Sequence, residues 1–109
     1  MIYVDFNAGG KEYKLRLNTR NTITLEKMLG CNPLSIFGDG ETLPQITTLV
    51  NVLYCSLLQF QHGITLEDAY DIFDAYLADG HSATEFLSVV INIFKVSGLI
   101  KNDKANEKN

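Results

Sequence analysis

Five carboxylates lie close together in residues 66–80, LEDAYDIFDAYLADG, where most other residues are aromatic or aliphatic. Carboxylates at this density could ligate a metal ion, exchange protons in catalysis or present charge to a partner. A calcium-binding EF-hand needs oxygen ligands at alternate positions. The alternate positions after Asp68 and after Asp71 hold tyrosine, isoleucine, phenylalanine and alanine, so the segment is not a calcium loop.

The same residues form a regular pattern at helical spacing. One stripe consists of Leu66, Ala69, Tyr70, Phe73 and Leu77, and the opposite face carries Glu67, Asp71, Asp74 and Ala78. This periodicity predicts a helix with an acidic outer face. The face is either simply solvated or a docking surface for a basic segment, and the sequence leaves both interpretations open.

The two histidines are the remaining candidates for chemistry. His62 and His81 lie at predicted helix boundaries among glycine and polar neighbours, where histidines are usually exposed to solvent. Nucleophilic catalysis requires a serine or cysteine near a histidine and an orienting acid, and His81 with Glu85 would supply only two metal ligands. The segment AGGK at residues 8–11 lacks two required positions of a phosphate-binding loop. We therefore predict no catalytic residue, no metal site and no cofactor, and a protein that is not an enzyme.

The elements that position these residues fit one domain. The chain has 109 residues, of which 46% are hydrophobic and 20% charged, as is typical of a folded globular protein with one core. We expect a single domain over residues 1–100 and a flexible polar tail over residues 101–109.

Charge is distributed unevenly within a formal net charge of −4. Residues 1–40 hold five Lys or Arg against four Asp or Glu, whereas residues 41–100 hold Lys95 alone against seven acids. An acidic helical part repels phosphate backbones, so we expect a protein partner and no nucleic acid. The first residues lack a secretory signal and the last helix is too short to span a membrane, which predicts a cytoplasmic protein without a membrane partner. In that reducing compartment, Cys31 and Cys55, each among apolar neighbours, should be buried free thiols.

The secondary structure is expected to begin with a β-hairpin and to continue as helices. Alternating residues 2–6 and 11–17 flank a turn at residues 7–10, and one face of this hairpin should be buried. Residues 23–29 form a helix capped by Asn21 or Thr22 and closed by Gly30, and residues 31–41 form a loop with one helical turn near residues 34–37. Further helices cover residues 43–61, residues 66–79 after the cap Thr65, and residues 83–97 after a Ser82–Glu85 capping box. The predicted fold class is α+β: a two-stranded hairpin packed on a mainly helical body of about four helices.

The helices over residues 43–61 and 83–97 are apolar around most of their circumference. The first has a narrow polar stripe that consists of Gln45, Thr48, Ser56 and Gln59. Helices of this kind need cover on several sides. We expect either an exposed apolar patch or a surface for homo-oligomer formation; in the alternative interpretation the hairpin and the acidic helix cover both helices.

The order of these parts is similar to that of the small tail assembly chaperones of long-tailed phages and prophages of Gram-positive bacteria. The similarity rests on Leu25-Glu26-Lys27-Met28-Leu29-Gly30, on Asn32-Pro33-Leu34 and on the run from Thr65 through Gly80, and it covers the layout of residues 1–100. It implies a chaperone that keeps the long, helical tape measure protein soluble before the tail tube polymerises around it. The tail tube protein is then a further partner, and the chaperone is absent from the mature virion. Such chaperones are commonly made in a short form and a frameshifted long form.

The partner-binding residues are predicted from the helix faces, because the resemblance transfers none. They are Tyr70, Asp71, Phe73, Asp74, Tyr76 and Leu77, with Phe94 from the last helix. Core packing is the favoured interpretation for Phe73 at the middle of its stripe, whereas Tyr76, beside polar positions, is the favoured contact. Two other functions stay open: an acidic protein that occupies a basic nucleic-acid site on a target, and a structural subunit of a virion.

Overall fold

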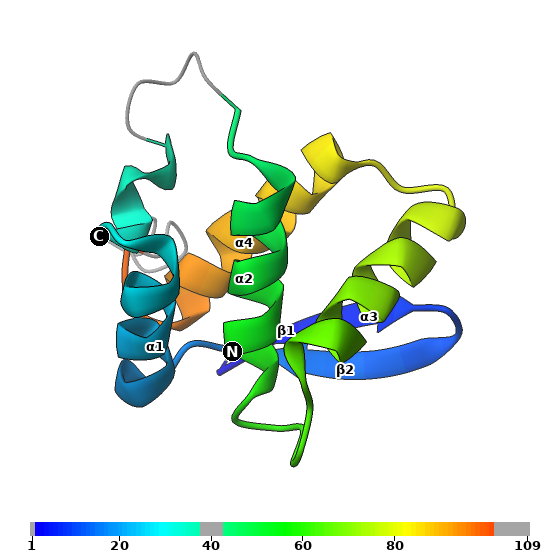
Figure 1. Ribbon diagram of the computed structural model, residues 1–109, viewed down its shortest axis with the longest axis horizontal. Helices are drawn as coiled ribbons and strands as arrows, with labels where there is room; N and C mark the ends of the chain where they lie inside the picture. The colour runs from blue at the N-terminus through cyan, green and yellow to red at the C-terminus, as the bar shows by residue number, and fades with distance from the viewer. Residues whose placement is uncertain (1, 38–42, 102–109) are drawn as a thin grey trace, which may run out of the picture.

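The computed structural model describes residues 2–37 and 43–101. Its strands are β1 (Val4–Ala8) and β2 (Lys11–Leu15), and its helices are α1 (Thr19–Leu29), the short 3-10 helix η1 (Pro33–Phe37), α2 (Ile46–Leu57), α3 (Leu66–Ala78) and α4 (Ala83–Val96). The predicted α+β class is confirmed, because an antiparallel two-stranded hairpin packs on four α-helices (Figure 1). Most of the predicted polar tail, residues 102–109, and residues 38–41 of the predicted loop lie outside the described residues, as does residue 42.

The hairpin turns through two glycines with left-handed backbone, Gly9 at φ 59° and Gly10 at φ 79°. Two consecutive residues of this kind form the tight turn that matches the twist of paired strands. The register pairs Phe6 with Tyr13 and Ala8 with Lys11. The face that holds Phe6 and Ala8 is turned towards the helices, which confirms the predicted hairpin with one buried face.

Helix α2 is the central element of the body. It packs against α1, α3, α4 and β2, and Figure 1 shows α1 and α3 on opposite sides of it. This arrangement covers most of the apolar circumference of α2, while Ile46 at its first position and Leu43 in the preceding segment remain exposed. Ser56 is a correction to the predicted polar stripe: it is fully buried, and its hydroxyl donates to the backbone carbonyl of Leu53 at 2.9 Å. The helix covers Ile46–Leu57 instead of the predicted residues 43–61, and Pro44 therefore lies before its first turn.

Four aromatic rings join the hairpin to α3 and α4. Phe86 of α4 packs edge-on against Phe6 at 5.7 Å, Phe73 at 5.3 Å and Tyr76 at 5.6 Å between ring centroids. Edge-to-face pairs at these distances stabilise a core beyond the burial of their area. The cluster fixes which side of α3 faces inward.

The ends of the helices are set by local hydrogen bonds. Asn18 caps α1, since its side chain accepts from the Asn21 N–H at 2.8 Å; the predicted cap at Asn21 or Thr22 is therefore wrong, because both residues lie inside the helix. The left-handed Gly30 at its end and the helical turn η1 are confirmed. The Thr65 cap and the Ser82–Glu85 capping box are confirmed as well.

The two cysteines differ in their surroundings. Both are free thiols; Cys55 is buried, and burial raises its pKa to about 12. Cys31 is exposed, which corrects the prediction that both are buried, because it follows the end of α1 and lies outside the packed layers.

In the part of the chain that the structure describes, no helix has the length and apolar character needed to cross a membrane.

Candidate functional site

The outer surface of α3 combines carboxylates with exposed apolar side chains. The capping box of Thr65 and Asp68 starts the helix, with bonds of 3.0 and 3.1 Å between the two residues. Ala69, Ile72, Phe73 and Tyr76 face inward, which leaves Tyr70 44% exposed and Leu77 37% exposed. We call the surface formed by Glu67, Tyr70, Asp71, Asp74 and Leu77 the α3 face.

The charged side chains of the α3 face are all acidic. None of its three carboxylates forms an ion pair within residues 2–37 and 43–101, and the helix itself contains no basic residue. Tyr70, Asp74 and Leu77 follow one another at four and three residues, so the apolar and acidic side chains alternate along one ridge. Such a surface suits a partner that has both apolar and basic side chains.

Three of the seven predicted partner-binding residues lie in the core instead. Phe73, Tyr76 and Phe94 are 3%, 5% and 0% exposed, so the prediction that they contact a partner is corrected for the folded chain. Tyr76 was the favoured contact, but its ring packs on Phe6 at 5.1 Å and stacks on His81 at 4.4 Å. The remaining four residues, Tyr70, Asp71, Asp74 and Leu77, are brought together on the α3 face.

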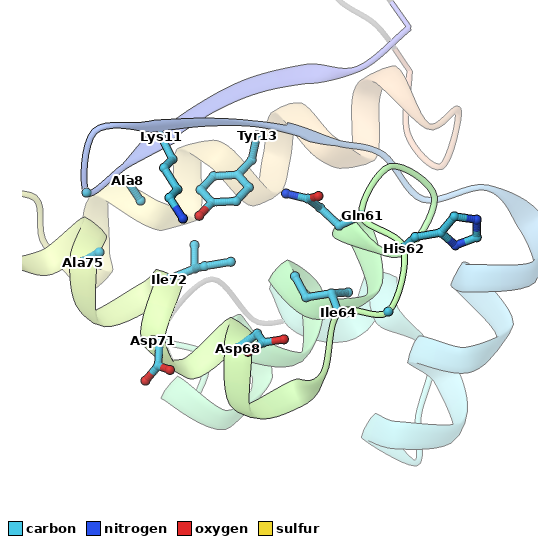
Figure 2. Close-up of a pocket in the computed structure, with 12 residues that line it drawn as sticks. Ala8, Lys11, Tyr13, Gln61, His62, Ile64, Asp68, Asp71, Ile72 and Ala75 are labelled. Atoms are coloured by element: carbon cyan, nitrogen blue, oxygen red, sulfur yellow. The ribbon is translucent and has the colours of Figure 1, made fainter.

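A groove of about 450 Å³ separates α3 from the hairpin. Lys11 and Tyr13 of β2 point across it towards Ile72, with Ala75 further along α3 and Ile64 in the preceding loop (Figure 2). Asp71 and His62, which also border the groove, point away from it (Figure 2). The groove can therefore receive an apolar group beside the Lys11 ammonium and the Tyr13 hydroxyl.

Sequence reasoning missed Lys11 as part of this groove. The signal was present, because strict alternation places Lys11 on the same face of the strand as Tyr13 and Leu15. A lysine at an inward position near a turn extends past the buried rows, so its charged end can reach the rim of a groove.

His81, which directly precedes the Ser82 cap of α4, pairs with a carboxylate in the first turn of that helix. His81 Nδ1 lies 3.1 Å from Glu85 Oε2, and the other Glu85 oxygen accepts from the Ser82 N–H at 3.2 Å. The His81 hydrogen bond holds the pKa of Glu85 below its usual range, and burial together with the Glu85 charge raises the pKa of Tyr76. Within the described residues, no three or more His, Cys, Asp or Glu side chains converge as metal ligands would. The arrangement is that of a charged helix cap.

The chain matches a family of unknown function (DUF6096) over residues 4–109, and it belongs to that family. No curated protein and no solved structure matches the chain. The α3 face and the neighbouring groove are therefore the observations from which a function can be inferred.

Proposed function

We propose that this member of the DUF6096 family is a non-enzymatic assembly chaperone that binds a helical protein client through the α3 face. One observation carries the proposal: α3 exposes Tyr70 and Leu77 between carboxylates that have no partner among the described residues. Exposed apolar side chains at helical spacing can pack against an amphipathic helix. The carboxylates keep such a surface, and a complex formed on it, in solution.

The client we propose is the tape measure protein of a long-tailed phage or prophage. The similarity of layout to phage tail assembly chaperones supports this identity, and the observed order of hairpin, short helix, central helix and acidic helix agrees with that layout. The chaperone would act in the cytoplasm of a bacterial host, with the tail tube protein as a further partner, and would be absent from the finished particle.

The groove beside α3 supports the proposal, because it can accept a client side chain next to the α3 face. An apolar client side chain that enters it would contact Ile72 and Ala75 and lie near Lys11. A polar or acidic client group could then be held by the Lys11 ammonium at the rim.

Co-expression with the tape measure protein encoded beside the gene tests the proposal. The wild-type protein should keep the client soluble and co-elute with it at low and at high salt, because apolar burial is insensitive to screening. The double variant Tyr70→Ser with Leu77→Ser should lose the client. The matched control, Ile2→Ser with Leu34→Ser, removes two exposed apolar side chains that are not part of α3 and should keep it. Equal retention by both variants would contradict the proposal.

The acidic residues favour a second candidate, a protein that occupies a basic nucleic-acid site on a target. Asp71 and Asp74 are exposed, unpaired within the described part, and separated by one helical turn. That function predicts binding that weakens as salt rises and that is lost in Asp71→Asn with Asp74→Asn. A structural virion subunit would instead be found in purified particles.

A further inference from the structure

Helix α1 exposes a surface whose charge is opposite to that of the α3 face. Ile23 is 45% exposed on α1, and the exposed Arg20 and Lys27 lie on one side of it. Neither Arg20 nor Lys27 forms an ion pair within residues 2–37 and 43–101. We call Arg20, Ile23 and Lys27 the α1 face.

The α1 face and the α3 face have matching spacings. Arg20 and Lys27 are seven residues apart, as are Glu67 and Asp74, and each pair spans about 10.5 Å along its helix at a rise of about 1.5 Å per residue. Tyr70 and Leu77, again seven residues apart, border the acids on one side, where a single large aliphatic side chain such as Ile23 can pack between them. Two ion pairs and one apolar contact can therefore form together.

The two faces cannot meet within one molecule. Helix α2 lies between α1 and α3, which are on opposite sides of the body (Figure 1). We propose that the occupant of the α3 face in the absence of a client is the α1 face of a second copy of this chain. Glu26, on the far side of Ile23 from the two basic residues, orients the contact, because the α3 carboxylates repel it.

A contact between two different faces is heterologous, so each copy keeps one free face of each kind. Addition of copies then closes into a ring or continues as an open helical chain, instead of stopping at a dimer. One helix-to-helix contact buries less than the roughly 1,000 Å² of a stable interface, so the assembly should depend on protein concentration and weaken as salt rises.

This inference goes beyond the proposed function and does not require a client. A client that binds α3 competes with the second copy, but self-association is measured on the protein alone. The variant Arg20→Glu with Lys27→Glu leaves the α3 face intact, so it should lose self-association and still bind the tape measure protein. The two proposals can therefore fail separately.

Sedimentation velocity of the full chain over a range of concentrations tests the inference. The average mass of the wild type should rise past that of a dimer. Two charge-reversed variants, Arg20→Glu with Lys27→Glu and Glu67→Lys with Asp74→Lys, should each associate about tenfold or more weakly, because both ion pairs become repulsive. A mixture of the two should assemble again, since every contact between unlike copies is then between opposite charges.

The matched control changes the same charges elsewhere. Asp5→Lys with Glu12→Lys reverses two exposed acids on the outer face of the hairpin and should assemble as the wild type does. Circular dichroism shows whether each variant is folded. A wild type that stays monomeric, an assembly that stops at a dimer, or a mixture of reversed variants that fails to assemble would each overturn the inference.

Discussion

Gly9 lies where the hairpin turn meets α3. Its N–H donates to Asp79 Oδ2 at 2.9 Å, and a Cβ added to it would lie 3.1 Å from the Cβ of Ala75. Gly10 has the same left-handed backbone, but a Cβ there would meet no atom of the described residues within 4 Å. The two glycines therefore separate the cost of backbone strain from the cost of close packing.

We expect Gly10→Ala to lower the free energy of unfolding by about 1–2 kcal/mol, the cost of left-handed backbone for a residue with a Cβ. Gly9→Ala should cost about 1 kcal/mol or more in addition, because the new methyl group pushes the turn away from Ala75. Urea denaturation of both variants measures the difference. Equal losses would show that the turn does not pack closely on α3.

Glu85 should make stability depend on pH at the acidic end. Its hydrogen bond with His81 lowers the pKa of the carboxyl from its ordinary 4.5 in the folded chain. A lowered pKa stabilises the fold at pH values above 4.5, and this contribution is lost as the pH falls through the folded pKa. Glu85→Gln keeps an acceptor for the Ser82 N–H but cannot carry the charge. We expect it to be less stable than the wild type near neutral pH and equal to it in strong acid.

Urea midpoints across the acidic range measure that convergence. Glu12→Gln, on the outer face of the hairpin, removes the same charge away from His81 and serves as the control. A constant difference between Glu85→Gln and the wild type at every pH would mean that the carboxylate charge makes no contribution.

At the scale of the elements, one hydrogen bond ties the start of the chain to its last helix. The Leu17 N–H, between β2 and α1, donates to Ser97 Oγ at 2.9 Å after the end of α4. Leu17 is buried and this hydrogen bond is partly buried, so removal of the hydroxyl leaves the N–H without its partner and with restricted access to water.

Ser97→Ala should lower the free energy of unfolding by about 1–3 kcal/mol, the cost of a buried donor left unsatisfied. Ser88→Ala, on the exposed face of the same helix, makes the same chemical change and should be close to neutral. Thermal unfolding of the two variants compares them directly. A loss in both would mean that α4 is sensitive to any serine replacement.

The types of the elements could be predicted from the sequence because their signals are local. The turn glycines Gly9 and Gly10 and the helix-ending Gly30 act through the backbone angles that they adopt. The helix caps Thr65 and Ser82 act through hydrogen bonds to residues three positions along the chain. The start of α1 was misplaced because Asn18 and Asn21 are both good caps, and only the position of the first turn selects between them.

The side of α3 that faces the core was predicted less accurately than the element types. Apolar residues occupy two overlapping stripes of this helix, and the sequence favoured the one with Tyr70 and Leu77. The observed buried stripe holds Ile72 and Tyr76, because the rings of Phe6 and Phe86 pack against Tyr76, whereas Tyr70 has no comparable ring contact among residues 2–37 and 43–101. Residues that are distant in the sequence decide which stripe is buried, and the periodicity of α3 alone carries no information about them.

At the scale of the whole molecule, the hairpin and the helices share one core. The buried residues of both strands and of α1 to α4 form a single cluster. Phe86 occupies a central place in it, since it is fully buried and its ring contacts rings from β1 and α3. The body should therefore unfold as a unit instead of releasing the hairpin first.

Phe86→Ala is expected to cost about 3–5 kcal/mol, a large part of the roughly 5–15 kcal/mol by which such a domain is stable. Phe86→Leu keeps most of the volume and should cost less, which separates the cavity from any effect of lost ring contacts. Both variants should show coincident transitions by the nuclear magnetic resonance signals of the Phe6 and Tyr13 amides, which report on the hairpin, and by far-ultraviolet circular dichroism, which reports on the helices. Loss of the hairpin signals before the loss of helix would mean that the hairpin is a separate unit, and that the groove beside α3 can open while the α3 face stays intact.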